Sequence, residues 1–179
     1  MTRLQVRLMI FAGVLLALPF FLSRKPRVAR RKIIRGQPQD IFPLVNDLRN
    51  WPRWTAWSRR EEMHFSYDGP PEGVGALQRW SSRRTMGELR LVQSLPHERV
   101  AYELEAAEGK YHLEGALSLE PLGENTRVTW LCTWRANPNP YARYIDLFFM
   151  WWIGRDFDLG LENLRQLVET APAAPQPVA

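Results

Sequence analysis

The feature that most limits the possible folds is an alternation of apolar and polar residues through the middle of the chain. Val128, Trp130 and Cys132 are separated by Thr129 and Leu131, and the runs 99–106 and 111–119 alternate in a similar way. Successive side chains of a strand point to opposite faces. The pattern therefore predicts an antiparallel sheet with one face covered and the other in water.

Turn signals rich in Gly, Pro, Asp and Asn divide this region into six expected strands, at 62–67, 75–82, 87–95, 99–106, 111–120 and 127–135. Another strand is expected at about 28–34, and a helix opens at Pro38. Residues 50–57 read as a tryptophan-rich loop. A long helical pattern runs from Tyr141 to about Thr170. Segregated strands and helices predict an α+β domain whose long C-terminal helix covers a curved antiparallel sheet.

An uncharged run, Leu8–Leu22, lies between Arg7 and Arg24. Fifteen apolar residues fall short of the roughly 20 that span a bilayer core, but flanking arginines that reach outward extend the span. A signal peptide and an apolar tail packed into the domain are the competing interpretations. The segment FFLSRKP lacks a small-residue cleavage pattern, so we expect an uncleaved, single-pass membrane anchor over residues 1–24. The folded domain is expected at 25–170, and a disordered Pro/Ala tail at 171–179.

The net charge of +5 is unevenly distributed. Residues 1–32 hold eight basic residues and no acidic one, whereas the rest of the chain holds 16 basic and 19 acidic residues. A mildly acidic folded part argues against nucleic acid as a partner. More basic residues follow the apolar run than precede it, so the positive-inside rule places the folded domain in the cytoplasm.

Four pieces of sequence then occur in a characteristic order: IRGQPQDIFPLVNDLRNWPRWTAW, YDGPPEGVGALQRWSS, ENTRVTW and IGRDFDLGLENLRQLVE. With them, the chain from about Arg27 to Thr170 resembles the polyketide cyclase/dehydrase and lipid-transport group of the START-like (SRPBCC) superfamily. The resemblance implies a helix-grip fold that holds a hydrophobic small molecule or lipid between sheet and helix. It implies no catalytic motif and no cofactor for this chain.

The aromatic residues are the signal with functional content. Six of them are expected to converge beneath the long helix, and Trp57 is expected at the mouth of the same space with Trp51 and Trp54; the ligand-binding candidates are Trp57, Trp80, Tyr102, Trp130, Trp134, Phe148 and Trp152. Aromatic rings suit flat or chain-like ligands, and an indole N–H or a phenol can orient one polar group. The same rings can instead fill the space, and the loop tryptophans can serve packing or touch a bilayer.

Other chemistry is poorly represented. His64, His97 and His112 lie far apart without metal-ligand spacing, so no metal site is expected. Cys132 reads as an inert buried thiol. Glu88 and Gln78 are polar residues within the expected strands, and the sequence does not decide whether their side chains point into the space beneath the long helix or away from it.

Three functions remain open. The first is a membrane-tethered protein that binds a hydrophobic small molecule or lipid. The second is a cyclase, dehydratase or hydrolase on the same fold. The third is an interaction module with a filled core.

Overall fold

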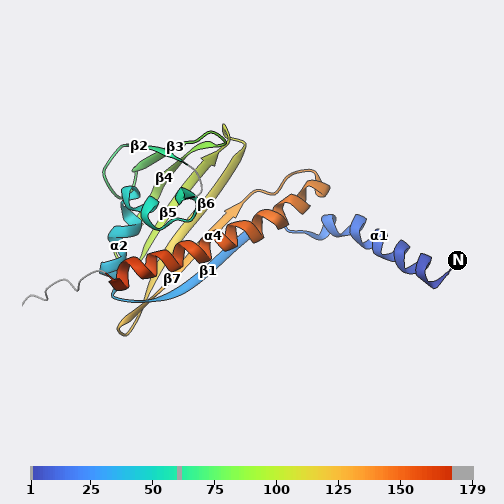
Figure 1. Cartoon of the computed structure of the whole chain (residues 1–179), viewed down its shortest axis with the longest axis horizontal. Coiled ribbons are helices and arrows are strands. Elements are labelled where there is room, and N and C mark those ends of the chain that lie inside the picture. Colours follow the sequence, from blue (N-terminus) through green and yellow to red (C-terminus); the bar gives the residue numbers. More distant parts are fainter. Residues whose placement is uncertain (1, 60–61, 171–179) are drawn as a thin grey trace, which may run out of the picture.

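The computed structural model describes residues 2–59 and 62–170 (Figure 1). Its helices are α1 (Arg3–Phe21), α2 (Pro38–Asn46), α3 (Trp51–Trp54) and α4 (Arg143–Thr170), with 3₁₀ turns η1 (Leu48–Asn50), η2 (Trp57–Arg59) and η3 (Pro140–Ala142). Its strands are β1 (Arg27–Arg35), β2 (His64–Asp68), β3 (Leu77–Ser81), β4 (Met86–Leu95), β5 (Arg99–Ala106), β6 (Tyr111–Leu122) and β7 (Asn125–Trp134). The expected α+β architecture is confirmed.

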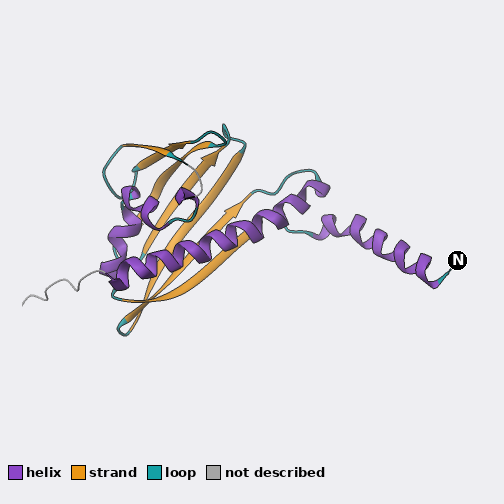
Figure 2. Ribbon diagram, viewed as in Figure 1, coloured by secondary structure: helices purple, strands orange, loops and turns teal. Residues whose placement is uncertain are grey.

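One seven-stranded antiparallel sheet has the order β1-β7-β6-β5-β4-β3-β2. Strands β2 to β7 form a meander of neighbours, and β1 closes the far edge by pairing with β7, with Val28 opposite Cys132. The sequence alternation reappears as burial, since Val128, Trp130 and Cys132 are buried on one face of β7. That face is the one that the helices cover (Figure 2).

Helix α4 packs along β1 and extends past the end of the sheet (Figure 1). Two glycines permit the close contact between α4 and the sheet. A Cβ at Gly160 would lie 2.9 Å from the Trp130 ring, and one at Gly154 would overlap the Arg30 guanidinium. Ion pairs join the outer sides of the two elements, from Arg30 to Asp158 at 3.0 Å and from Lys32 to Glu162 at 2.7 Å.

The tryptophan-rich stretch is a set of short helical turns and not the expected loop. Proline lies at the start of α3, where its fixed φ and missing N–H suit a first helical turn. Asp47 caps η1, because its side chain accepts a hydrogen bond from the Arg49 backbone N–H. These turns direct Trp51 and Trp54 into the core, where both are fully buried.

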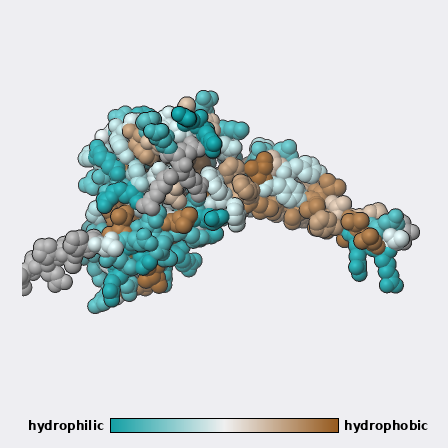
Figure 3. Space-filling view, in the orientation of Figure 1, coloured by the Kyte–Doolittle hydropathy of each residue, from teal (hydrophilic) through white to brown (hydrophobic). Residues whose placement is uncertain are grey.

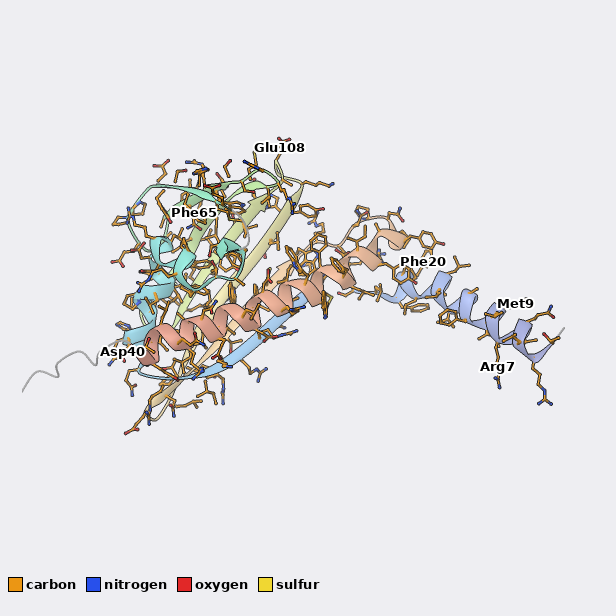
Figure 4. All side chains as sticks on the ribbon, in the orientation of Figure 1. Arg7, Met9, Phe20, Asp40, Phe65 and Glu108 are labelled. Carbon is orange, nitrogen blue, oxygen red and sulfur yellow. The ribbon has the colours of Figure 1, made fainter. Side chains whose placement is uncertain are left out.

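Helix α1 projects away from the domain, and it begins at a capping box formed by Thr2 and Gln5. Met9 and Phe20 point outward from it (Figure 4). Its length and hydropathy are sufficient to cross a membrane, and only 6% of the apolar window is buried. A signal sequence would meet the same criteria, whereas a packed apolar tail would be buried. The expected disordered tail at 171–179 lies outside the described residues.

Candidate functional site

Trp130 stands at the centre of the space between sheet and helix. Its ring stacks on Phe157 of α4, with centroids 3.9 Å apart and planes 5° from parallel. Trp54 and Trp51 pack edge-on against it at 5.1 and 6.1 Å. Tyr102 of β5 meets Trp51 edge-on at 5.2 Å. Because these five rings are essentially buried, they occupy the middle of the expected cavity.

The polar groups of this cluster already have protein partners. The Trp130 Nε1–H donates to the Tyr102 hydroxyl at 2.9 Å. Trp51 and Trp54 donate to the backbone carbonyls of Val45 and Leu44 at 3.0 and 3.1 Å. A ligand in the centre would have to displace these bonds, and an unpaired buried N–H is costly. The central rings therefore serve packing in this structure.

Farther along the same sheet face, apolar side chains are only half-buried. The register aligns Leu104 with Leu113 and Leu113 with Trp134, while Trp80 lies over Gly87 in the neighbouring strand. We call this group the apolar rim; its members are Trp57, Trp80, Leu104, Leu113, Trp134, Met150 and Ile153. The last two come from α4 and Trp57 comes from η2, so the rim is formed by both the sheet and the helical elements.

The seven sequence candidates thus divide into three groups. Tyr102 and Trp130 lie in the packed centre, and Trp57, Trp80 and Trp134 lie in the rim. Phe148 and Trp152 do not converge with them: they lie on the outer side of α4, 60% and 39% exposed. The helical spacing that suggested inward positions holds only while the sheet lies beneath the helix.

Trp134 in the rim is oriented by α4. Its Nε1–H donates to Asp146 Oδ1 at 2.9 Å, while Asp146 Oδ2 is a buried oxygen without a hydrogen-bond partner. The sequence reasoning did not single out Asp146. It also missed Asp156, a carboxyl on α4 that is 4% exposed. In both cases the signal is burial, which a helical pattern alone does not reveal.

Gln78 and Glu88, whose side-chain direction the sequence left open, have structural roles. Gln78 is buried, and its Nε2 donates to the Leu48 carbonyl at 3.1 Å and to the Tyr67 hydroxyl at 3.2 Å. Glu88 pairs with Arg79 at 3.3 Å, and His112 pairs with Glu105 at 2.9 Å on the exposed face. Within residues 2–59 and 62–170, no group of three His, Cys, Asp or Glu side chains is arranged to hold a metal ion.

Two titratable groups on the covered side of the sheet have raised pKa values, which keeps both groups neutral. Burial raises the pKa of the Cys132 thiol to about 12. Burial, with a smaller effect of Cys132, also raises the pKa of Tyr102 well above its usual range, against the opposing hydrogen bond from Trp130. A thiol this far from ionisation is a poor nucleophile at neutral pH.

Among the hollows at the surface of the described residues are two that the tryptophan cluster does not line. One of about 320 Å³ lies between the linker at 22–27 and residues 143–150 of α4. The other, of about 800 Å³, lies at the opposite end of the molecule beside Pro38, His97 and Arg99. The first adjoins the rim through Met150 and is the hollow nearest to α1.

A curved antiparallel sheet that grips one long C-terminal helix defines the helix-grip class of folds. The family model for polyketide cyclase / dehydrase and lipid transport matches residues 25–169, and the chain belongs to this family. The resemblance noted in the sequence is therefore confirmed. A search of curated protein sequences returned no match.

Solved structures share the fold at low sequence identity. TTHA0849 from Thermus thermophilus is 18% identical, with a TM-score of 0.65 over 83% of this chain and 100% of its own. CalU16 from Micromonospora echinospora is 12% identical, with a TM-score of 0.54 over 82% and 85%. DynU16, from the dynemicin biosynthetic locus, is 14% identical with a TM-score of 0.58; the match covers 80% of this chain and 47% of that protein.

Proposed function

We propose that this protein is a membrane-tethered binding protein for a hydrophobic small molecule or lipid, which it holds at the apolar rim. One observation argues most strongly for this. Next to a centre that is closed by packing, seven apolar side chains from the sheet, η2 and α4 remain half-buried. Incompletely buried apolar surface is what a hydrophobic ligand covers, at about 25 cal/mol per Å² removed from water.

The composition of the rim favours a ligand with a flat or chain-like apolar body. Trp57, Trp80 and Trp134 offer aromatic faces, and the three leucine or isoleucine side chains offer aliphatic surface. The Trp134 indole N–H is occupied by Asp146, so it does not provide a free donor. The expected ligand is therefore recognised mainly by shape and apolar area.

The membrane tether keeps such a site close to its ligand. A ligand that is poorly soluble in water partitions into a bilayer, and an anchored domain remains close to that source. Helix α1 has the length and hydropathy for the anchor, and it joins the domain on the side of the hollow beside the rim. The family description, which includes lipid transport, supports the same class of ligand.

The enzyme alternative draws on the same family description, which also names cyclase and dehydrase activity. It needs an inward-facing acid or base. Gln78 and Glu88 have other roles, and Cys132 is held neutral. The acids left to it are the buried carboxyls of α4, Asp156 and Asp146, and the second of these accepts a hydrogen bond from Trp134. The filled centre agrees with the interaction-module alternative, but the half-buried rim is unexplained by it. Binding therefore accounts for more of the structure.

The test uses the full chain purified in a mild detergent, followed by native mass spectrometry and organic extraction. We expect a bound hydrophobic species that is lost in Leu113→Trp, which fills the rim, and kept in Ile33→Trp, which adds the same ring on the exposed face of β1. Thermal unfolding checks that both variants fold. Equal retention of the species by both variants, or its absence from the unmodified chain, would count against a rim site.

A further inference from the structure

The first half of α4 differs sharply from the second in its surface. Exposed large apolar side chains gather in residues 143–153, whereas residues 154–170 contribute one, Leu159; the first group is Ile145, Leu147, Phe148, Trp151 and Trp152. At about 100° per residue these five span an arc of roughly 160° around the helix. We call them the aromatic face. The sequence 143–153 has two charged residues, Arg143 and Asp146, and both turn away from this face.

This segment is joined directly to the end of α1. The Arg143 guanidinium donates to the carbonyls of Pro19 and Leu22, at 3.0 and 3.5 Å. These belong to the last turn of α1 and the residue after it, where carbonyls lack helical partners and a cation is favoured. The Tyr144 hydroxyl donates to the Leu15 carbonyl, and Phe20 meets Tyr141 edge-on at 5.9 Å.

The two apolar surfaces are therefore continuous in space. Figure 3 shows the apolar surface of α1 running onto the neighbouring end of α4. If α1 crosses the bilayer, its last turn lies at the membrane surface, and the aromatic face must lie there too. Residues 143–153 extend about 16 Å, which is too short to cross a bilayer core of about 30 Å.

The residue types fit the boundary between headgroups and acyl chains. Tryptophan and tyrosine are favoured at that depth, and basic side chains next to it attract anionic lipids. Arg24, Lys25 and Arg27 follow α1 directly. Arg155 lies over the Trp151 ring at 5.6 Å, so a cation also borders the aromatic face on α4.

We propose that the aromatic face of α4 inserts into the headgroup region of the same bilayer that α1 crosses, so that the domain is held at two points with the apolar rim near the membrane surface. This inference rests on the membrane tether of the proposed function but not on its ligand. A single helix with a flexible linker would leave the domain free to rotate. Two linked contacts fix its orientation.

The test places a nitroxide on single cysteines in the full chain, reconstituted in vesicles of phosphatidylcholine and phosphatidylglycerol. The positions are Phe148→Cys on the aromatic face, Leu16→Cys on α1 and Leu159→Cys as the matched control. Leu159 is 49% exposed and lies eleven residues, or about three turns, from Phe148 on the same side of α4. The unmodified chain, whose Cys132 is buried, gives the labelling background.

We expect collisions with oxygen, relative to a water-soluble nickel chelate, to be several-fold more frequent at Phe148 than at Leu159, and highest at Leu16. If the oxygen-to-nickel collision ratio is equally low at Phe148 and Leu159 but high at Leu16, the second contact is overturned and the tether stands. Water-like values at all three positions would overturn both. Spin–spin broadening at Phe148 that disappears on dilution with unlabelled chain would instead assign this face to a second copy.

Discussion

At the scale of single residues, the centre of the domain is specified by ring-to-ring contacts that leave little freedom. Trp130 stacks on Phe157, and its indole N–H is satisfied by the Tyr102 hydroxyl. In turn, the Tyr102 ring lies directly over Gly115, where any side chain would overlap it. Each contact depends on the previous one, so substitutions here test whether the centre is a packed core.

Tyr102→Phe removes the acceptor for Trp130 and leaves a buried N–H unpaired. The unfolding free energy of the full chain in detergent, measured with urea, should fall by about 1–3 kcal/mol. Tyr67→Phe is the matched control, because the Tyr67 side chain is more exposed and its donor Gln78 keeps a second bond to Leu48. Equal losses in the two variants would contradict the assigned role of the Trp130–Tyr102 bond.

Gly115→Ala places a methyl group inside the Tyr102 ring. The Gly115 backbone does not have a positive φ, so the cost is steric, and overpacking of this kind typically costs about 1–3 kcal/mol. The double variant Gly115→Ala/Tyr102→Leu should lose less than the sum of its single variants, because leucine vacates the space. Strict additivity in chemical denaturation would show that the ring is not the obstacle.

At the scale of elements, α4 is fastened to the sheet by its glycines on one side and by ion pairs on the other. Glu162 accepts from Arg165 at 2.5 Å and pairs with Lys32 of β1 at 2.7 Å, and Arg165 also reaches Glu169. The hydrogen bonds from Arg165 and Lys32 lower the pKa of Glu162 from 4.5 to about 2. This network connects the end of α4 to the edge strand.

The depressed pKa of Glu162 fixes the pH dependence of its contribution. The folded state keeps the carboxylate ionised, while the unfolded chain binds a proton near pH 4.5. The contribution is therefore complete above about pH 4.5 and is lost as the pH falls toward 2. The difference in Tm between the unmodified chain and Glu162→Gln should shrink over that interval. A Tm difference for Glu162→Gln that stays constant over that interval would contradict the assignment.

The sequence predicts those elements whose pattern is local and repeated. Alternation in β5, β6 and β7 predicts both the strands and their covered face, because a period of two places alternate side chains on opposite faces of a sheet. The turns at 48–59 escape such reasoning, since three- and four-residue helices are too short to show a period. Two of their three tryptophans, Trp51 and Trp54, are buried in the core, in agreement with a packing role for the loop tryptophans.

The candidate site is harder to predict from the sequence, because it depends on where the helices and strands end relative to one another. Trp130 and Trp134 have the same alternation, yet one is in the packed centre and the other is in the rim. Phe148 and Trp152 follow helical spacing, but the sheet no longer lies beneath them. Position along β7 separates Trp130 from Trp134, and the extension of α4 beyond the sheet separates Phe148 and Trp152 from both. A local sequence pattern encodes neither of these two features.

At the scale of the whole molecule, and with α1 as the proposed membrane anchor, the distribution of charge predicts on which side of the membrane the domain lies. Two basic residues precede the apolar run of α1, whereas Arg24, Lys25, Arg27 and the basic residues of early β1 follow it. Such residues are retained on the cytoplasmic side. The domain and the aromatic face of α4 should therefore meet the inner leaflet, whose anionic lipids also suit the basic linker.

Thiol labelling of intact cells with a membrane-impermeant reagent tests this orientation, using the full chain with one added cysteine. Leu159→Cys, exposed on the folded domain, should react only after the membrane is permeabilised. Thr2→Cys, on the other side of α1, should react in intact cells. Cys132 is buried with a raised pKa, so the unmodified chain should remain unlabelled in its folded state. Labelling of Leu159→Cys in intact cells would place the domain outside, and the basic linker would then have another role than orientation.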